Sequence, residues 1–175
     1  MRGERVEWVD AEGRVLGTVD RARAARERRP VRIASAICRD AGGRVLVARR
    51  AEGVRRYPGS WQLALGGAAG VGEAGAAAVV RELAEELGAA AVRGAAPVPL
   101  GAVFVALDPF GPFRAELFEV SLSGPVRADP AEVAEVRWST PAEVAARVPG
   151  EPGAWTPETG AVLARWRAAG PRSRP

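Results

Sequence analysis

Apolar and polar residues alternate along several short segments of the chain, a pattern that is typical of β-strands. Residues 4–9 and 14–19 flank the turn DAEG and predict an N-terminal hairpin. Residues 31–40 and 44–50 predict two stronger strands joined by a short turn. The N-terminal part of the chain is therefore expected to be mainly β-structure.

The middle of the chain continues this pattern. WQLALGG (61–67) alternates as a strand and ends in a glycine pair. Residues 98–107 and 113–122 are separated by the turn DPFGP, so we expect them to pair antiparallel. A last strand is predicted over 133–138.

Capping residues mark where helices begin. Asp20 is predicted to cap a short helix that ends at Ala25. A Ser-Thr pair precedes Pro141, the expected first residue of a second helix, and Thr156 precedes Pro157 in the same way. Mixed strands around one central helix, with another helix on the far side, predict an α/β sandwich.

The central helix is predicted over residues 74–87 and carries its charge unevenly. At about 100° per residue, its three glutamates, Glu82, Glu85 and Glu86, share one face. The other side carries an apolar stripe formed by Ala76, Val80, Leu83 and Leu87. We expect the stripe to pack and the acidic face to point away from the core.

The acidic face is unfavourable unless something binds to it. Like charges three or four residues apart destabilise a helix by about 0.2–0.5 kcal/mol per pair, and glutamates near the C-terminus oppose the helix dipole. A hard divalent cation would turn this repulsion into ligation. The alternative is a solvated acidic surface.

Composition limits the available chemistry. The chain has 175 residues, enough for one domain with a sizeable core, and 47% of them are hydrophobic. It contains no histidine, so proton transfer must use carboxylates or metal-bound water. Its single cysteine, Cys38, lies in a predicted strand, where packing is the expected role.

The charge pattern favours no macromolecular partner. The net charge is +4, and the densest run of arginines, in residues 21–29, has no aromatic residue interleaved. We expect that run to be a solvated surface and not a nucleic-acid site. No strongly apolar stretch approaches a membrane span and the first residues are charged, which predicts a cytoplasmic protein without membrane association.

The segment from the glycine pair through the central helix has the spacing G-x5-E-x7-R-E-U-x-E-E-x-G-U, where U is a bulky apolar residue. The fixed positions are filled by Gly67, Glu73, Arg81, Glu82, Leu83, Glu85, Glu86 and Gly88, and only the last apolar position, Ala89, is weak. The chain therefore resembles the Nudix hydrolases. The resemblance implies a Nudix-type α/β/α sandwich with a mixed β-sheet and a central catalytic helix.

A looser resemblance covers nearly the whole chain. The N-terminal hairpin, GGRVLVARR, the YPGSW loop, AEVRW and the WTPET end are similar to the bacterial Nudix subgroup related to isopentenyl-diphosphate isomerase. It implies an N-terminal hairpin extension (1–30), a Nudix hydrolase domain (31–165) and a C-terminal tail (166–175).

The isomerases themselves are the competing assignment. Their chemistry uses a cysteine in the strand before the box and a metal site that includes histidines. Here that strand is WQLALGG, Cys38 lies in another segment, and histidine is absent. Hydrolysis is therefore the preferred prediction.

The hydrolase resemblance implies a Mg²⁺ site, in which Mn²⁺ could substitute. Glu82 and Glu86 would be direct ligands. The remaining metal-site candidates are Glu85, a backbone carbonyl of Gly66 or Gly67, and Glu73 acting through water.

The same resemblance implies the catalytic groups. Arg81 would orient Glu85 by a charge-assisted hydrogen bond. Glu82 is the first candidate for the base that takes a proton from water. Glu116 or Glu119 on a neighbouring strand are the alternatives, unless both simply face outward.

Side chains around the box could bind substrate. The arginines before it are phosphate-binding candidates or solubilising surface residues: Arg49, Arg50, Arg55 and Arg56. Three aromatic residues could stack on a base or pack within loops: Tyr57, Trp61 and Phe110.

The resemblance implies cleavage of a diphosphate linkage in a nucleoside diphosphate derivative or a related small molecule. Two other functions stay open: a catalytically silent sensor that binds a nucleotide, and an RNA-associated factor. The substrate would be chosen by loops at 51–60, 108–112 and 149–156, for which the sequence offers no code. The sequence also does not decide between a monomer and a homodimer.

Overall fold

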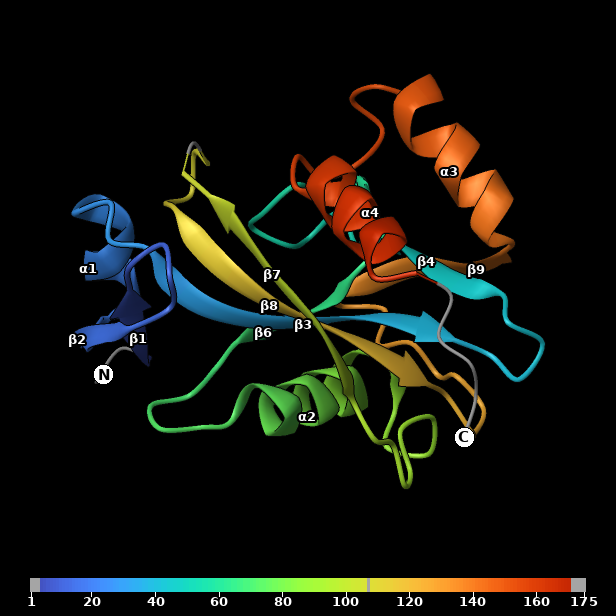
Figure 1. Ribbon diagram of the computed structural model, residues 1–175, viewed down its shortest axis with the longest axis horizontal. Helices are drawn as coiled ribbons and strands as arrows, with labels where there is room; N and C mark the ends of the chain where they lie inside the picture. Colours follow the sequence, from blue (N-terminus) through green and yellow to red (C-terminus); the bar gives the residue numbers. More distant parts are fainter. Residues whose placement is uncertain (1–3, 107, 171–175) are drawn as a thin grey trace.

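The computed structural model describes residues 4–106 and 108–170. The strands in these ranges are β1 (Arg5–Val9), β2 (Val15–Asp20), β3 (Val31–Arg39), β4 (Val45–Arg50), β5 (Trp61–Gln62), β6 (Leu65–Ala68), β7 (Val98–Val105), β8 (Phe113–Ser121) and β9 (Val133–Ser139). The helices are α1 (Arg21–Arg26), α2 (Gly75–Leu87), α3 (Pro141–Gly150) and α4 (Thr159–Ala168). Figure 1 shows α2 on one side of the sheet and α3 and α4 on the other. The predicted α/β sandwich with a mixed sheet is confirmed.

Strand β3 is the centre of the sheet. It pairs parallel with β8 along its whole length and antiparallel with β6 from Ile33 to Ala36. Strand β8 in turn pairs antiparallel with β7, as predicted. Strands β3 and β4 touch only at Arg39 and Val45, so the two strands separate beyond the turn and β4 pairs with β9 and β5 instead.

The single strand predicted over 61–67 is two strands. Gln62 in β5 pairs with Ala48 of β4, whereas Gly66 in β6 pairs with Ser35 of β3. The segment crosses from one half of the splayed sheet to the other, and this crossing interrupts the strand. It also delivers the glycine pair to the middle of the sheet, in front of α2.

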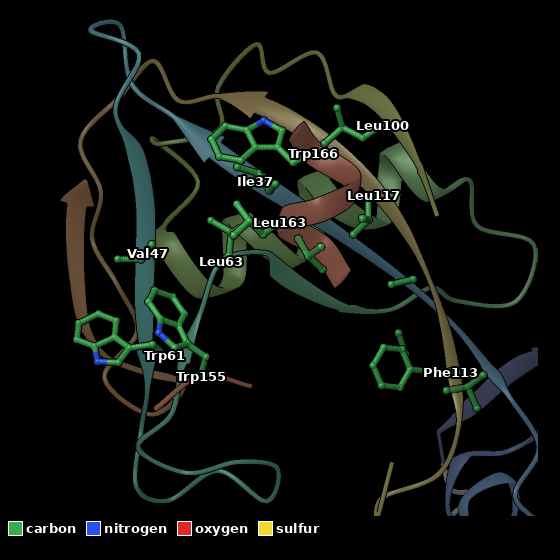
Figure 2. Close-up of a cluster of buried hydrophobic side chains, with 14 of the residues drawn as sticks. Ile37, Val47, Trp61, Leu63, Leu100, Phe113, Leu117, Trp155, Leu163 and Trp166 are labelled. Atoms are coloured by element: carbon green, nitrogen blue, oxygen red, sulfur yellow. The ribbon is translucent and has the colours of Figure 1, made fainter. Parts of the chain in front are cut away.

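The two faces of the sheet carry separate hydrophobic clusters. Ile37 of β3 packs toward α4, in the cluster drawn in Figure 2 with Leu163 and Trp166. Its neighbours Ala36 and Cys38 point to the other face and pack under α2. Cys38 is fully buried, which confirms its packing role, and burial raises the pKa of its thiol.

Most predicted helix starts are confirmed. The Asp20 carboxylate accepts a hydrogen bond from the Arg23 amide, and Thr140 forms a capping box with Glu143. The prediction that the last helix begins at Pro157 is wrong by two residues. Thr156 is held beside Trp61 by a backbone hydrogen bond, so residues 157–158 form a turn before α4 starts.

The N-terminal hairpin shares the core of the domain. Trp8 of β1 pairs with Val31 of β3, and the buried side chains of Val6, Val19 and Ala24 belong to the same cluster as Ile37. At the other end, α4 runs through the predicted boundary at residue 165. Across the described ranges, no helix is long and apolar enough to span a bilayer.

Candidate active site

The glycine pair before α2 lies where β3, β6 and α2 come together. Gly66 has φ +142°, and a side chain there would collide with the backbone carbonyl of Ala34 on β3. A Cβ on Gly67 would overlap the carboxylate of Glu82. Both glycines are therefore required by close approach, Gly66 to the sheet and Gly67 to the acidic face of the helix.

The predicted separation of packing face and acidic face on α2 is only partly confirmed. Leu83 and Leu87 of the apolar stripe are buried as predicted, whereas Ala76 and Val80 are only partly buried. The buried arc instead extends over Ala78, Val79 and Glu86. Small side chains beneath the helix, at Ala34, Ala36 and Ala69, let it lie close to the sheet. Burial therefore extends around the helix as far as its carboxylates.

The three glutamates of α2 have different environments. Glu86 is 8% exposed, Glu82 is mostly buried, and the side chain of Glu85 is 63% exposed. All three line one cleft of about 930 Å³. The three carboxylates that were predicted to share one face therefore differ in burial, from the solvated Glu85 to the enclosed Glu86.

Arg81 lies behind Glu82, outside the residues that line the cleft. It donates hydrogen bonds to Glu82 (2.7 Å) and Glu73 (2.9 and 3.0 Å), and another to the Ala68 carbonyl. Its closest approach to Glu85 is an ion pair at 3.6 Å, so the predicted hydrogen bond to Glu85 is replaced by bonds to the other two glutamates. Arg81 thus positions Glu82.

Glu73 anchors this arginine. Its carboxylate also accepts a hydrogen bond from the Gly70 amide, and together the hydrogen bonds from Arg81 and Gly70 lower the pKa of Glu73 to about 2. Glu73 is saturated by these donors and lies outside the cleft lining. Its position suits support of Arg81 better than direct metal ligation.

Glu86 is the most perturbed carboxyl group of the site. Burial raises its pKa to about 8, and the nearby Glu82 carboxylate adds to the shift, while Arg50 opposes it. One carboxylate oxygen of Glu86 is buried without a hydrogen-bond partner among the described residues. A buried charge of this kind is costly until a cation neutralises it.

This burial predicts an unusual pH dependence for the metal-free protein. Because the pKa of Glu86 rises from an ordinary value near 4.5 to about 8 on folding, the folded state retains a proton that the unfolded state has lost. The free energy of unfolding should therefore fall as pH rises from about 4.5 to 8 and then level off. Chemical denaturation across this range in EDTA measures it, and an E86Q variant should lose that part of the slope.

Arginines surround the carboxylates. Three of the four candidate phosphate-binding arginines, Arg50, Arg55 and Arg56, line the cleft, and Arg50 also donates hydrogen bonds to the Arg56 carbonyl and to Gln62. Six further charged residues that were not expected at the site also line the cleft: Glu4, Asp20, Arg21, Arg29, Asp129 and Glu132. No local motif marks them; they come from the two ends of the N-terminal hairpin, from α1, from the loop after it and from the loop before β9.

Three candidates lie elsewhere. Arg49 faces away from the cleft and is ion-paired with Glu135 at 3.3 Å and with Glu52 at 3.5 Å. Glu116 is paired with Arg32 at 3.1 Å, and Glu119 accepts a hydrogen bond from the Trp166 indole at 2.8 Å. None of the three lines the cleft, so the structure does not support Arg49 as a phosphate ligand or Glu116 and Glu119 as bases.

A smaller pocket of about 120 Å³ opens from the cleft between the sheet and α4. Arg50, Arg56 and both glycines line the cleft and the pocket alike. Behind them the lining of the pocket is part apolar and part polar. Its apolar residues are Ile33, Ala64, Phe113, Ala115, Leu117 and Val162, and its polar residues are Ser35, Tyr57, Gln62, Thr156, Glu158 and Thr159.

A buried carboxylate at Asp108 holds one wall of this pocket. It accepts hydrogen bonds from the Tyr57 hydroxyl (2.7 Å) and the Phe110 amide (2.7 Å), and it is ion-paired with Arg56 at 3.0 Å. Phe110 lies edge-on to Tyr57, and Arg56 lies over the Phe113 ring. Tyr57 and Phe110 therefore pack with each other, and Trp61 packs against Trp155, while Tyr57 also lines the pocket and Phe110 the cleft.

Replacing Asp108 by asparagine should loosen this wall. Arg56 loses its buried counter-ion, so we expect a loss of about 1–3 kcal/mol in the free energy of unfolding and faster amide exchange in residues 51–60. Asp40→Asn is the matched control, because Asp40 pairs with Arg44 at 2.7 Å in a turn far from the pocket. Equal effects of the two substitutions would contradict a special role for Asp108.

The ligand groups of the cleft fit a hard divalent cation. Within the described ranges, three or more acidic or cysteine side chains do not converge into a ready-made metal cage. Mg²⁺ usually takes one or two carboxylates, and water and substrate phosphates complete its shell. Glu82 and Glu86 supply such a pair, and Glu86 has the unpartnered oxygen that a cation would satisfy.

Comparison with known proteins agrees with this geometry. A model of the NUDIX domain family matches residues 29–161, so the chain belongs to the Nudix hydrolase family. It is 38% identical over 162 residues to an isopentenyl-diphosphate Delta-isomerase of Nocardia farcinica, covering 90% of this chain and 91% of that one. It is 34% identical over 139 residues to an uncharacterized Nudix hydrolase of Pseudomonas aeruginosa, covering 79% of each chain.

The fold is shared with solved structures. The crystal structure of DR0079 from Deinococcus radiodurans superimposes with a TM-score of 0.75 and 24% identity, covering 93% of this chain and 98% of that one. The MutT protein of Methanosarcina mazei gives a TM-score of 0.65 at 23% identity, covering 81% and 95%. At these identities the similarity concerns the fold alone.

Proposed function

We propose that this Nudix hydrolase cleaves a diphosphate linkage in a Mg²⁺-dependent reaction. The observation that carries the proposal is the Glu86 carboxylate, which is buried beside Glu82 with an unpartnered oxygen, in a cleft whose other walls carry arginines. The carboxylates of the cleft complement a metal cation, and its guanidinium groups complement the phosphate oxygens of a diphosphate.

Each charged side chain then has a role. Glu82 and Glu86 would hold Mg²⁺, with a carbonyl of the glycine pair as a further ligand. When bound, Mg²⁺ neutralises the diphosphate and acidifies a water molecule. Glu85 is the solvated carboxylate of the cleft and is the candidate to accept the proton from the attacking water. Arg50 and Arg56 would bind phosphate oxygens.

The substrate is proposed to be a nucleoside diphosphate derivative or a smaller diphosphate. The pocket behind Gly66 and Gly67 measures about 120 Å³, a volume that suits a single ring or a short branched chain better than a complete nucleoside. A larger substituent would have to extend along the cleft. The names of the relatives make isopentenyl diphosphate one compound to test.

Isomerisation is not proposed for this chain. Its one cysteine is buried under α2 and lies outside the cleft lining, and it has no histidine. Gly66 and Gly67 occupy the end of the strand that leads to the carboxylates, and they offer no side chain for proton transfer.

A phosphate-release screen tests the proposal. The panel should contain nucleoside diphosphate sugars, dinucleoside polyphosphates and isopentenyl diphosphate, each with Mg²⁺ and with EDTA. We expect turnover that EDTA abolishes and that an E86Q variant lacks. Absence of turnover by the wild type on the whole panel would contradict the proposal. Salt-sensitive RNA binding that survives E86Q would favour the RNA-associated alternative.

A further inference from the structure

Glu7 on β1 is a buried carboxylate in the N-terminal hairpin, outside the segment that matches the NUDIX domain model. It is only 7% exposed. One oxygen accepts a hydrogen bond from the Gly72 amide at 2.9 Å, and the other accepts one from Arg32 at 2.5 Å. Glu7 thus joins the hairpin to the loop that leads into α2.

Arg32 makes the second connection to this loop. It lies on β3, is 9% exposed, and donates a hydrogen bond to the Glu73 carbonyl as well as to Glu7. Its remaining partner is Glu116, at 3.1 Å. The pair Glu7–Arg32 therefore fixes the backbone at two consecutive residues, Gly72 and Glu73.

Within the loop, the Gly70 amide donates to the Glu73 carboxylate at 2.7 Å and the Glu73 amide donates to the Gly70 carbonyl at 3.1 Å, so the middle of the loop has fewer contacts than its ends. Val71 is half exposed, and Gly72 has φ +73° with open space where a side chain would be. Without Glu7, the Gly72 amide would have only solvent to bond to. Among the described contacts, Glu7 is the group that joins the exposed middle of the loop, at Gly72, to the hairpin.

The loop matters because Glu73 holds Arg81, and Arg81 holds Glu82. The Glu73 carboxylate accepts two hydrogen bonds from Arg81, which donates a third, at 2.7 Å, to the Glu82 carboxylate. An unbroken series of short polar contacts therefore runs from Glu7 to a candidate metal ligand.

We propose that Glu7 is a positioning residue for the metal site: with Arg32 it fixes the loop 70–73 and so, through Glu73 and Arg81, the orientation of Glu82. This inference rests on the proposed metal-dependent function. It assigns the N-terminal hairpin a role in the active site beyond its contribution to the core. Replacing a side chain that supports a metal ligand in this way commonly lowers metal affinity by roughly 10- to 100-fold.

The test compares the full-length wild type with Glu7→Gln and Glu7→Ala. Glutamine keeps an oxygen that can accept from Gly72 but loses the charge opposite Arg32, whereas alanine loses both. Mn²⁺ affinity is measured by electron paramagnetic resonance, and exchange of the Gly72 amide by hydrogen–deuterium exchange. We expect affinity to fall in the order wild type, Glu7→Gln, Glu7→Ala, with a total loss of about 10-fold, and Gly72 exchange to accelerate in the same order.

Glu12→Gln is the control, because Glu12 lies at the turn of the same hairpin with its side chain 70% exposed. It should match the wild type in both measurements. If Glu7→Ala does not fold, Glu7→Gln alone decides, since it preserves volume. A folded Glu7 variant with wild-type Mn²⁺ affinity and wild-type Gly72 exchange would overturn the inference. A wild type that binds no Mn²⁺ would instead refute the proposed function, and the Gly72 exchange would still report whether Glu7 fixes the loop.

Discussion

Replacing Glu86 by glutamine is expected to reduce turnover by at least about 100-fold while stabilising the metal-free protein. The carboxylate is buried with one unpartnered oxygen, so its charge is useful only when a cation is bound. Glutamine keeps the shape and removes the charge. Steady-state kinetics in Mg²⁺ and denaturant unfolding in EDTA measure the two effects on the same preparation.

The stability gain should depend on pH. At pH 6 the folded wild-type protein retains the Glu86 proton, because burial raises the pKa of Glu86 to about 8, whereas the unfolded chain has already lost it, so part of the gain is present there. At pH 9 the folded carboxyl group is ionised as well, and the variant should then be more stable by a few kcal/mol, since each unit of pKa shift corresponds to about 1.4 kcal/mol. Mg²⁺ should stabilise the wild type at pH 9 and leave E86Q unchanged.

Glu52→Gln is the matched control, because Glu52 is exposed and ion-paired only loosely with Arg49 at 3.5 Å. It should leave turnover and metal-free stability unchanged. An E86Q protein with wild-type turnover would show that this carboxylate is not a metal ligand. If E86Q loses turnover without a pH-dependent gain in stability, burial of the Glu86 carboxylate does not destabilise the metal-free protein.

The local parts of the fold follow from sequence patterns with defined geometry. Caps at Asp20 and Thr140 depend on contacts three residues apart, and a helix places Glu82, Glu85 and Glu86 within one turn whatever surrounds it. The box spacing therefore predicted that these three carboxylates would lie together. It did not predict which of them would be buried, because that depends on the small alanines beneath α2, Ala34 and Ala36 of β3 and Ala69 just after β6.

Strand residues are harder to assign, because neighbouring side chains point to opposite faces. Arg49 and Arg50 are adjacent and equally basic, yet Arg50 enters the cleft and Arg49 pairs with Glu135 on the far side. For the same reason, the sequence left open whether Glu116 and Glu119 point into the site. The register of β8 between β3 and β7 decides their direction, and no local pattern encodes it.

Contacts between distant segments could not be predicted at all. Arg21 reaches the cleft only because the hairpin packs on β3, and Glu7 meets Gly72 across 65 positions of sequence. From the sequence alone, Arg21 and Glu7 would both be interpreted as ordinary surface charges. Their roles depend on tertiary packing, which single-sequence patterns do not specify.

A second large effect is expected from Gly67→Ala. The backbone at Gly67 has no unusual φ, so alanine should be tolerated there by the strand. Its Cβ would, however, overlap the Glu82 carboxylate, which is the flexible end of a side chain and can move aside. We expect a folded protein whose Glu82 is displaced, and a fall in turnover of about 100-fold, as is common when a reacting group shifts by about 1 Å. Turnover and thermal unfolding of the purified variant measure it.

Gly160→Ala supplies the control for Gly67→Ala, because Gly160 lies in α4 with open space around a Cβ and outside the cleft. It should keep wild-type turnover and gain stability, since alanine is favoured over glycine within a helix by about 0.5–1 kcal/mol. If Gly67→Ala unfolds the protein, the glycine is needed for packing and not for the position of Glu82. If the variant keeps full turnover, the position of Glu82 observed here is not required for the reaction.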